Sequence, residues 1–176
     1  AIDKRDFQFQ LCDTIEDIKE GSNNLVLSWD DNVEITLGIP TDVSGAYALK
    51  SIDAAIEAAK AGKIHALLTA PINKHNIAAS VEGFSGHTGY LANQFGNEVL
   101  MILTSDQLKV ATVTGHVPIS KVAEGITEAS VGKAIELLAL SLKRDFGIVK
   151  PRIAVLGLNP HAGEMGTIGS EEGETI

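Results

Sequence analysis

Residues 153–164, Ile-Ala-Val-Leu-Gly-Leu-Asn-Pro-His-Ala-Gly-Glu, join a continuous apolar run to a polar loop. The run at 153–157 is apolar at successive rather than alternating positions, which predicts a strand buried on both faces. The loop that follows carries Asn159 and His161. Ligands of open α/β sheets bind beyond the carboxyl ends of the strands. This stretch therefore predicts an α/β fold with a functional loop at a strand end.

Helical patterns lie between the strand-like runs. Apolar residues recur at helical spacing over 44–61, and Gly62 follows where a C-terminal cap is expected. Thr127 is suited to cap a second, longer helix, which Gly147 ends. Helices that alternate with continuous apolar strands predict an α/β fold with a largely parallel sheet. We expect one α/β unit over residues 1–176.

Shorter runs predict the remaining strands. Two β-prone runs at 25–29 and 33–37 are separated by turn residues, which predicts a hairpin. Continuous apolar runs predict strands at 66–69, 99–104 and 110–114.

The composition excludes several classes of protein. The formal net charge is −9 without a cluster of Lys and Arg, which argues against nucleic acid as a partner. Cys12 is the single cysteine, so a disulfide framework and a cysteine-rich zinc site are excluded. No apolar run has the length needed to cross a bilayer. We expect a cytoplasmic protein without nucleic-acid or membrane partners.

Polar segments directly follow three of the predicted strands. Lys74 lies in the first segment, His116 in the second, and Asn159 and His161 in the third. If the strands are parallel neighbours, these four side chains converge at one edge of the sheet. Spacing alone leaves two interpretations of each histidine: a ligand, or a partly buried residue whose ring hydrogen-bonds to the backbone.

Two glycine-containing segments are further candidates. Gly86-His87-Thr88 precedes a short helical pattern, and free N–H groups at a helix start attract anions, to which His87 and Thr88 can add donors. The alternative is that Thr88 only caps the helix and His87 is a loop residue. The glycines at 163–169 do not match the G-x-G-x-x-G pattern of dinucleotide sites. We interpret them as a glycine-rich active-site loop.

Together these motifs resemble the 4-hydroxythreonine-4-phosphate dehydrogenase family of pyridoxal phosphate biosynthesis. The specific part is the loop at 157–164, followed by Gly169, Glu171 and Glu172. Supporting segments in the family's order and at about its spacing are 69–74, 86–88 and 114–118. The resemblance covers most of the chain from about Gly38 onward.

The resemblance implies roles for individual residues. His87 and Thr88 match the family's substrate-binding pair. His116 and His161 match two of its three metal-binding histidines, and the third belongs to a C-terminal portion outside this sequence.

Other positions match the family's site less directly. Lys74 and Asn159 match polar positions near it and are possible supporting residues. Gly89 departs from the family, which usually carries an acidic residue there, and this departure bears on fine substrate preference.

The resemblance also implies a fold, a reaction and an assembly. The family shares the three-layer α/β/α fold of the isocitrate and isopropylmalate dehydrogenases, of which this chain would be an incomplete part of a longer two-domain enzyme. The reaction is oxidation and decarboxylation of 4-phosphooxy-threonine, with NAD or NADP and a divalent metal such as Zn, Mg or Co. The family works as a homodimer with active sites at the subunit interface.

Alternatives stay open at this point. A truncated chain with two of three histidines should bind metal poorly and not turn over substrate. A dehydrogenase of a related four-carbon sugar-acid phosphate, such as threonate or erythronate 4-phosphate, has the same motifs. A metal-dependent hydrolase would use the same histidines with Glu164 as base. A non-catalytic domain would use the histidines structurally.

Overall fold

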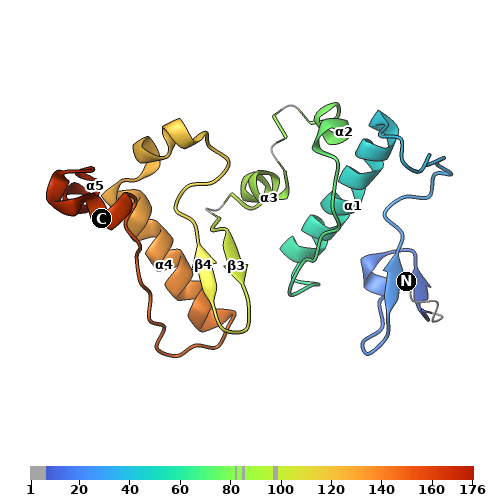
Figure 1. The fold of residues 1–176 in the computed structure, drawn as a ribbon. Helices are drawn as coiled ribbons and strands as arrows, with labels where there is room; N and C mark the ends of the chain where they lie inside the picture. Colours follow the sequence, from blue (N-terminus) through green and yellow to red (C-terminus); the bar gives the residue numbers. More distant parts are fainter. Residues whose placement is uncertain (1–6, 82, 85, 97–98) are drawn as a thin grey trace. The chain divides into compact units, whose positions relative to one another are not determined.

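The computed structural model describes residues 7–81, 83–84, 86–96 and 99–176, and Figure 1 traces its elements. The chain forms two compact units, residues 1–97 and residues 98–176, and each is described by itself. The expectation of one α/β unit over the whole chain stays a prediction.

The first unit begins with a small parallel ribbon. Strand β1 (Gln10–Cys12) pairs with β2 (Asn24–Val26), and the 3₁₀ turn η1 (Ile15–Asp17) lies in their connection. The predicted hairpin of 25–29 with 33–37 is therefore wrong. Leu25 pairs instead with a residue that precedes it in sequence, Leu11, and no element forms at 33–37. The apolar pattern indicated a strand but not its partner, because pairing depends on the whole chain.

Helix α1 (Asp42–Lys60) organises the rest of this unit and confirms the helix predicted at 44–61. Its start is a capping box, in which Ser44 N donates to Thr41 Oγ1 over 3.1 Å and Thr41 N donates to Ser44 Oγ over 3.3 Å. Its end is closed by Gly62 with φ +69°, as predicted. One face of α1 buries Ile56, whose side chain is only 1% exposed.

Two short helices follow α1 in this unit. Helix α2 (Lys74–Ala78) packs against α1, where Ile77 is fully buried. Burial of an isoleucine of this kind stabilises by about 1.5–3 kcal/mol. Gly45 lies at the same contact, because a Cβ there would collide with the backbone carbonyl of Asn76. Helix α3 (His87–Phe95) also contacts α1.

The second unit contains a hairpin and a long helix. Strands β3 (Ile102–Thr104) and β4 (Lys109–Ala111) confirm two predicted strands, but they pair antiparallel rather than parallel. The connection is too short for a parallel crossover, and Ser105 N donates to Leu108 O over 2.8 Å to close the turn. The turns η2 (Ile119–Lys121) and η3 (Ala123–Gly125) precede α4.

Helix α4 (Glu128–Arg144) confirms the second predicted helix. Thr127 caps it in a box with Ser130, and the two backbone-to-hydroxyl distances are 3.1 and 2.9 Å. After the helix, the positive φ of Gly147 allows Ile148 N to donate to Leu142 O over 2.8 Å. The unit ends with η4 (Pro160–Gly166) and α5 (Glu171–Glu174).

The strands predicted at 66–69 and 153–157 are wrong for the described chain, where neither segment has a hydrogen-bonded neighbour. Leu68 is 98% exposed and Leu156 is 82% exposed. A continuous apolar run needs a flanking strand on each side to become a buried strand, and the described sheets have two strands each. The largely parallel sheet is likewise corrected to one parallel and one antiparallel pair.

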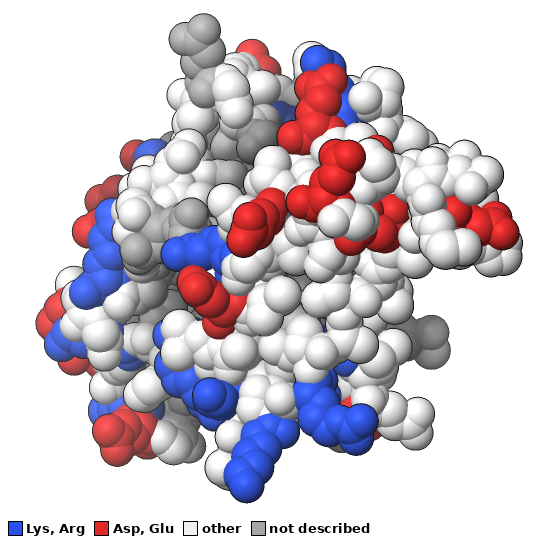
Figure 2. All heavy atoms as spheres, turned by 90° about the vertical axis from the view of Figure 1, so that its left-hand side faces the viewer, with Lys and Arg blue, Asp and Glu red and all other residues white. Residues whose placement is uncertain are grey.

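The described surface carries charged side chains of both signs. Figure 2 shows both Asp or Glu and Lys or Arg side chains among the described residues of the face that lies to the left in Figure 1. No described helix combines the length and apolar composition that a bilayer crossing requires.

Candidate functional site

The start of α3 leaves hydrogen-bond donors open. Gly86 is its N-cap with φ 120°, no side chain caps the helix, and the first turn is closed by Tyr90 N donating to Gly86 O over 3.1 Å. The alternative that Thr88 serves as a cap is therefore wrong. His87 Nε2 is buried without a hydrogen-bond partner in the described structure. A buried polar atom without a partner is costly unless a ligand or ion supplies one.

Lys74 lies beside this helix start. A Cβ at Gly86 would lie 3.1 Å from Lys74 Cε and 3.4 Å from Nζ, so the absence of a side chain there leaves room for the lysine. Lys74 is the first residue of α2, where Asn73 Oδ1 accepts from His75 N over 3.0 Å. An ammonium beside free helical N–H groups is an arrangement that attracts an anion such as phosphate.

Two polar contacts hold α2 and α3 on α1. Asn76 Nδ2 donates to Ser44 Oγ over 3.2 Å, and Tyr90 Oη donates to Asp53 Oδ1 over 2.6 Å. Burial, followed by the hydrogen bond to Asp53, raises the pKa of Tyr90 to about 12. Helix α1 thus fixes the two helix starts whose residues meet at Gly86.

The loop that carries His161 has an unusual backbone. Five consecutive residues of η4 have positive φ, and His161 (φ 52°) is the first of them. The remaining ones are Ala162, Gly163, Glu164 and Met165. The left-handed conformation costs roughly 1–2 kcal/mol per non-glycine residue, and it normally occurs in single residues. Contacts outside the turn must therefore hold it in place.

Carboxylates from α5 bind the residue at the start of this turn. Asn159 N donates to Glu172 Oε1 over 2.6 Å, and Asn159 Nδ2 donates to Glu172 Oε2 over 3.1 Å and to Glu171 Oε2 over 2.7 Å. The backbone hydrogen bond from Asn159 holds the pKa of Glu172 below its ordinary value. Asn159 therefore faces the protein's own acidic groups.

The predicted site residues fall into two groups. Lys74, His87 and Thr88 belong to the first unit, whereas His116, Asn159 and His161 belong to the second. The parallel sheet edge that would unite them does not form from the described strands, so their convergence stays a prediction.

The histidines of the second unit are both accessible. His116 and His161 are exposed, and each has a left-handed backbone with φ 56° and 52°. Within the described residues, no three His, Cys, Asp or Glu side chains form a group that could hold a metal ion. Two imidazoles match a divalent cation in donor type. They do not match it in number, because catalytic zinc sites use three protein ligands.

The sequence gives no signal for several contacts around Asn159 and around the start of α3. Glu171 and Glu172 belong to the motif that resembles the family, but their spacing from Asn159 does not indicate that they bind it. Tyr90 and Asp53 lie 37 positions apart and carry no local signal of their contact.

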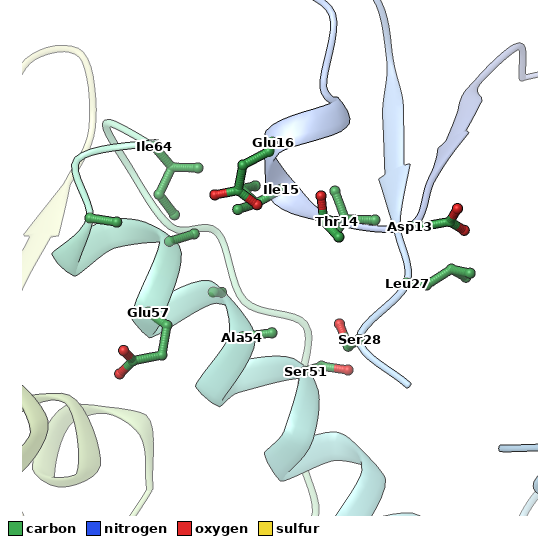
Figure 3. Close-up of a pocket in the computed structure, with 14 residues that line it drawn as sticks. Asp13, Thr14, Ile15, Glu16, Leu27, Ser28, Ser51, Ala54, Glu57 and Ile64 are labelled. Carbon is green, nitrogen blue, oxygen red and sulfur yellow. The ribbon is translucent and has the colours of Figure 1, made fainter. Parts of the chain in front are cut away.

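A pocket of about 600 Å³ lies elsewhere in the first unit (Figure 3). Ala54 and Ser51 of α1 line one side, and residues around η1, including Glu16, line the other. None of the predicted site residues lines this pocket. It is therefore separate from the candidate site.

Nearly the whole chain matches the model of a known protein family. The model of the pyridoxal phosphate biosynthetic protein PdxA matches residues 2–176. The chain belongs to the PdxA family. A 4-hydroxythreonine-4-phosphate dehydrogenase of Bacteroides thetaiotaomicron is 39% identical over 170 residues, which are 96% of this chain and 47% of that protein. The enzyme of the same name from Pseudoalteromonas translucida is 43% identical over 143 residues, which are 81% of this chain and 43% of that protein.

Solved PdxA structures share the fold. A 4-hydroxythreonine-4-phosphate dehydrogenase from Burkholderia phymatum superimposes with a TM-score of 0.77 at 34% identity, over 97% of this chain and 52% of that one. The enzyme from Klebsiella pneumoniae gives 0.79 at 28% identity, over 94% and 52%. The chain has the α/β fold of these PdxA proteins and spans about half their length.

Proposed function

We propose that this chain forms part of a 4-hydroxythreonine-4-phosphate dehydrogenase, which oxidises and decarboxylates 4-phosphooxy-threonine with NAD or NADP and a divalent metal. Its membership of the PdxA family and the names of its relatives support the reaction class. The three-layer fold of the isocitrate dehydrogenases, a homodimer with interfacial active sites and a cytoplasmic location belong to the same proposal.

The observation that carries the proposal is the unpartnered Nε2 of His87 at the open start of α3. We assign the phosphate of the substrate to this position. Free backbone N–H groups and the side chains of His87 and Thr88 would donate to phosphate oxygens, and the Lys74 ammonium would balance their charge. These contacts would orient the substrate and would take no part in the chemical step.

The histidines of the second unit have a separate role in the proposal. His116 and His161 supply two imidazole ligands for the divalent metal, and Asn159 supports the loop of His161. Because two ligands are fewer than a catalytic site requires, we assign no chemical step to a metal held by this chain.

Titration with inorganic phosphate tests the anion site. Phosphate should shift the amide resonances of His87 and Thr88, and Lys74→Met should weaken binding roughly tenfold, as expected for a lost hydrogen bond between charged groups. The control is His75→Ala, an exposed neighbour on α2, which should bind phosphate normally. If phosphate leaves the α3 amides unshifted, the assignment is wrong.

Calorimetry with zinc tests the histidine pair. We expect weak binding that His116→Ala and His161→Ala both abolish. Tight binding that neither substitution abolishes would overturn these ligands. A chain of the relatives' full length should oxidise 4-phosphooxy-threonine with NAD faster than threonate or erythronate 4-phosphate, which distinguishes the related dehydrogenase.

A further inference from the structure

We propose that Glu172, assisted by Glu171, is a positioning residue that holds Asn159 and thereby fixes the left-handed turn that presents His161. The inference rests on the proposed function in one respect, namely that His161 belongs to the site. Neither carboxylate contacts a substrate in this proposal, so both act through Asn159.

Three hydrogen bonds to the two carboxylates hold Asn159 in place. Glu172 accepts from both the backbone N–H and the side-chain amide of Asn159, at 2.6 and 3.1 Å. Glu171 accepts from the same side-chain nitrogen at 2.7 Å. Two acceptors on a single nitrogen and a third contact on the backbone fix both the main chain and the side chain of Asn159. Hydrogen bonds of this kind to ionised groups are short and strong.

The position of Asn159 determines how the turn begins. His161 lies two residues later, and every residue from His161 to Met165 has positive φ. Asn159 O also accepts from Ala162 N over 3.2 Å, so the clamped residue is bonded to the turn itself. At the far end of the turn, Ile168 N donates to Gly163 O over 3.1 Å.

Three glycines allow the carboxylates to approach the turn. A Cβ at Gly163 would lie 2.8 Å from Glu172 Oε2, and a Cβ at Gly157 would lie 3.2 Å from Glu172 Oε1. A Cβ at Gly169 would lie 2.6 Å from Glu171 Oε2. The backbone is thus free of side chains at three points around the two acids. This close approach distinguishes the clamp from an ordinary exposed acidic helix.

The Asn159 amide proton provides the direct test, because a short bond to a carboxylate moves its NMR resonance downfield. In Glu172→Gln, we expect an upfield shift and amide exchange roughly tenfold faster, the factor that corresponds to about 1.4 kcal/mol. Glu174→Gln is the matched control on α5, since that side chain makes no contact with Asn159. The α4 amides report whether the unit stays folded. An Asn159 resonance and exchange rate unchanged in Glu172→Gln would overturn the clamp.

A second measurement follows the consequence for His161. Titration with Co²⁺ alone should broaden the ring resonances of His116 and His161, and Glu172→Gln should require roughly tenfold more Co²⁺ to broaden His161, as is typical when an outer group that orients a ligand is lost. An unchanged Co²⁺ response of His161 in Glu172→Gln would overturn the positioning role. If Co²⁺ broadens neither histidine in the unsubstituted chain, the proposed metal role fails, and the amide measurements alone decide the clamp.

Discussion

The start of α3 and the turn at η4 each present a histidine, but they do so in opposite ways. At α3, a right-handed helix begins without a side-chain cap, and His87 Nε2 is buried without a partner. At η4, a left-handed turn is bonded at its start to two carboxylates, and His161 is exposed. The first region has open donors, whereas in the second the donors of Asn159 are already occupied.

In our proposal, this difference assigns the anion to the first region and the cation to the second. Free N–H groups and a lysine favour a negatively charged ligand at α3. The exposed imidazoles of the second unit are the donor type that a divalent cation prefers. The two proposed ligands differ in the same way, because the substrate phosphate is an anion and the divalent metal is a cation.

Substitution of Gly45 should have the largest effect, because Gly45 lies where α1 contacts α2, the helix that begins with Lys74. In Gly45→Ala, the new Cβ would collide with the backbone of Asn76 and move α2 away from α1. We expect a loss of about 1–3 kcal/mol in the free energy of unfolding. Urea unfolding followed by the fluorescence of Trp29, which packs edge-on against Tyr47 of α1, reports this unit.

The control for that experiment lies in the other unit. Gly132 of α4 has open space where a Cβ would be placed. Gly132→Ala should leave the Trp29 transition unchanged and raise the stability of α4 by about 0.5–1 kcal/mol. An unchanged transition in Gly45→Ala would contradict the close contact of Gly45 with the backbone of Asn76.

Gly169→Ala should disrupt the second region alone. The added Cβ would collide with the side-chain amide of Asn159, so the clamp must open. We expect the Asn159 amide resonance to move as in Glu172→Gln, while the resonances of His87 and Thr88 stay in place. Gly173→Ala, at an open position of α5, is the comparison. Identical spectra for both variants would contradict the tight packing around Asn159.

Tyr90→Phe should weaken the attachment of α3 by about 1–2 kcal/mol, because it leaves Asp53 without its phenol donor. The pKa of Tyr90 is raised to about 12. The neutral phenol thus contributes stability that is fully present below the ordinary tyrosine pKa of about 10 and is lost as the pH rises through the folded value. Ultraviolet titration of Tyr90→Phe should lose the ionisation near pH 12. The ionisation of Tyr47 should remain, and its pKa is also raised, because its phenol donates to Asp31. Ionisation of Tyr90 at its ordinary pKa would contradict the contact.

Acid should have the smallest effect, through Glu172 in the second region. The pKa of Glu172 is lowered mainly by the backbone N–H of Asn159. Its contribution is therefore present above the ordinary glutamate pKa of about 4.3 and is lost as the pH falls through the lower folded value. The Asn159 amide shift, followed from neutral to acidic pH, should move in that window. In Glu172→Gln this transition should be absent, and its persistence would assign it to another group.

Local signals predicted the two long helices of this fold, α1 and α4. Thr41 with Ser44, and Thr127 with Ser130, mark helix starts by chemistry that acts within four residues, and both boxes form. Gly62 likewise marks the end of α1 through its own backbone freedom. Such signals need no knowledge of distant residues.

Strand partners and the clamp could not be predicted in the same way. Leu25 is β-prone wherever it lies, but its pairing with Leu11 depends on how the intervening segment closes. The run at 66–69 is apolar without a neighbour in the described chain. Asn159 was identified by its position after an apolar run, yet its bonds to Glu171 and Glu172 depend on a turn whose handedness no residue pattern indicated.

The left-handed turn reverses the usual effect of a side chain on stability. Where the backbone is right-handed or extended and space is open, replacing glycine with alanine usually stabilises a protein, because it reduces the freedom of the unfolded chain. From His161 to Met165 the backbone has the mirror-image conformation, in which every Cβ of an L-residue is crowded by its own carbonyl. Ala162 is exposed there and packs little. The turn would therefore become more stable by the removal of a methyl group, or by a D-amino acid introduced through chemical synthesis.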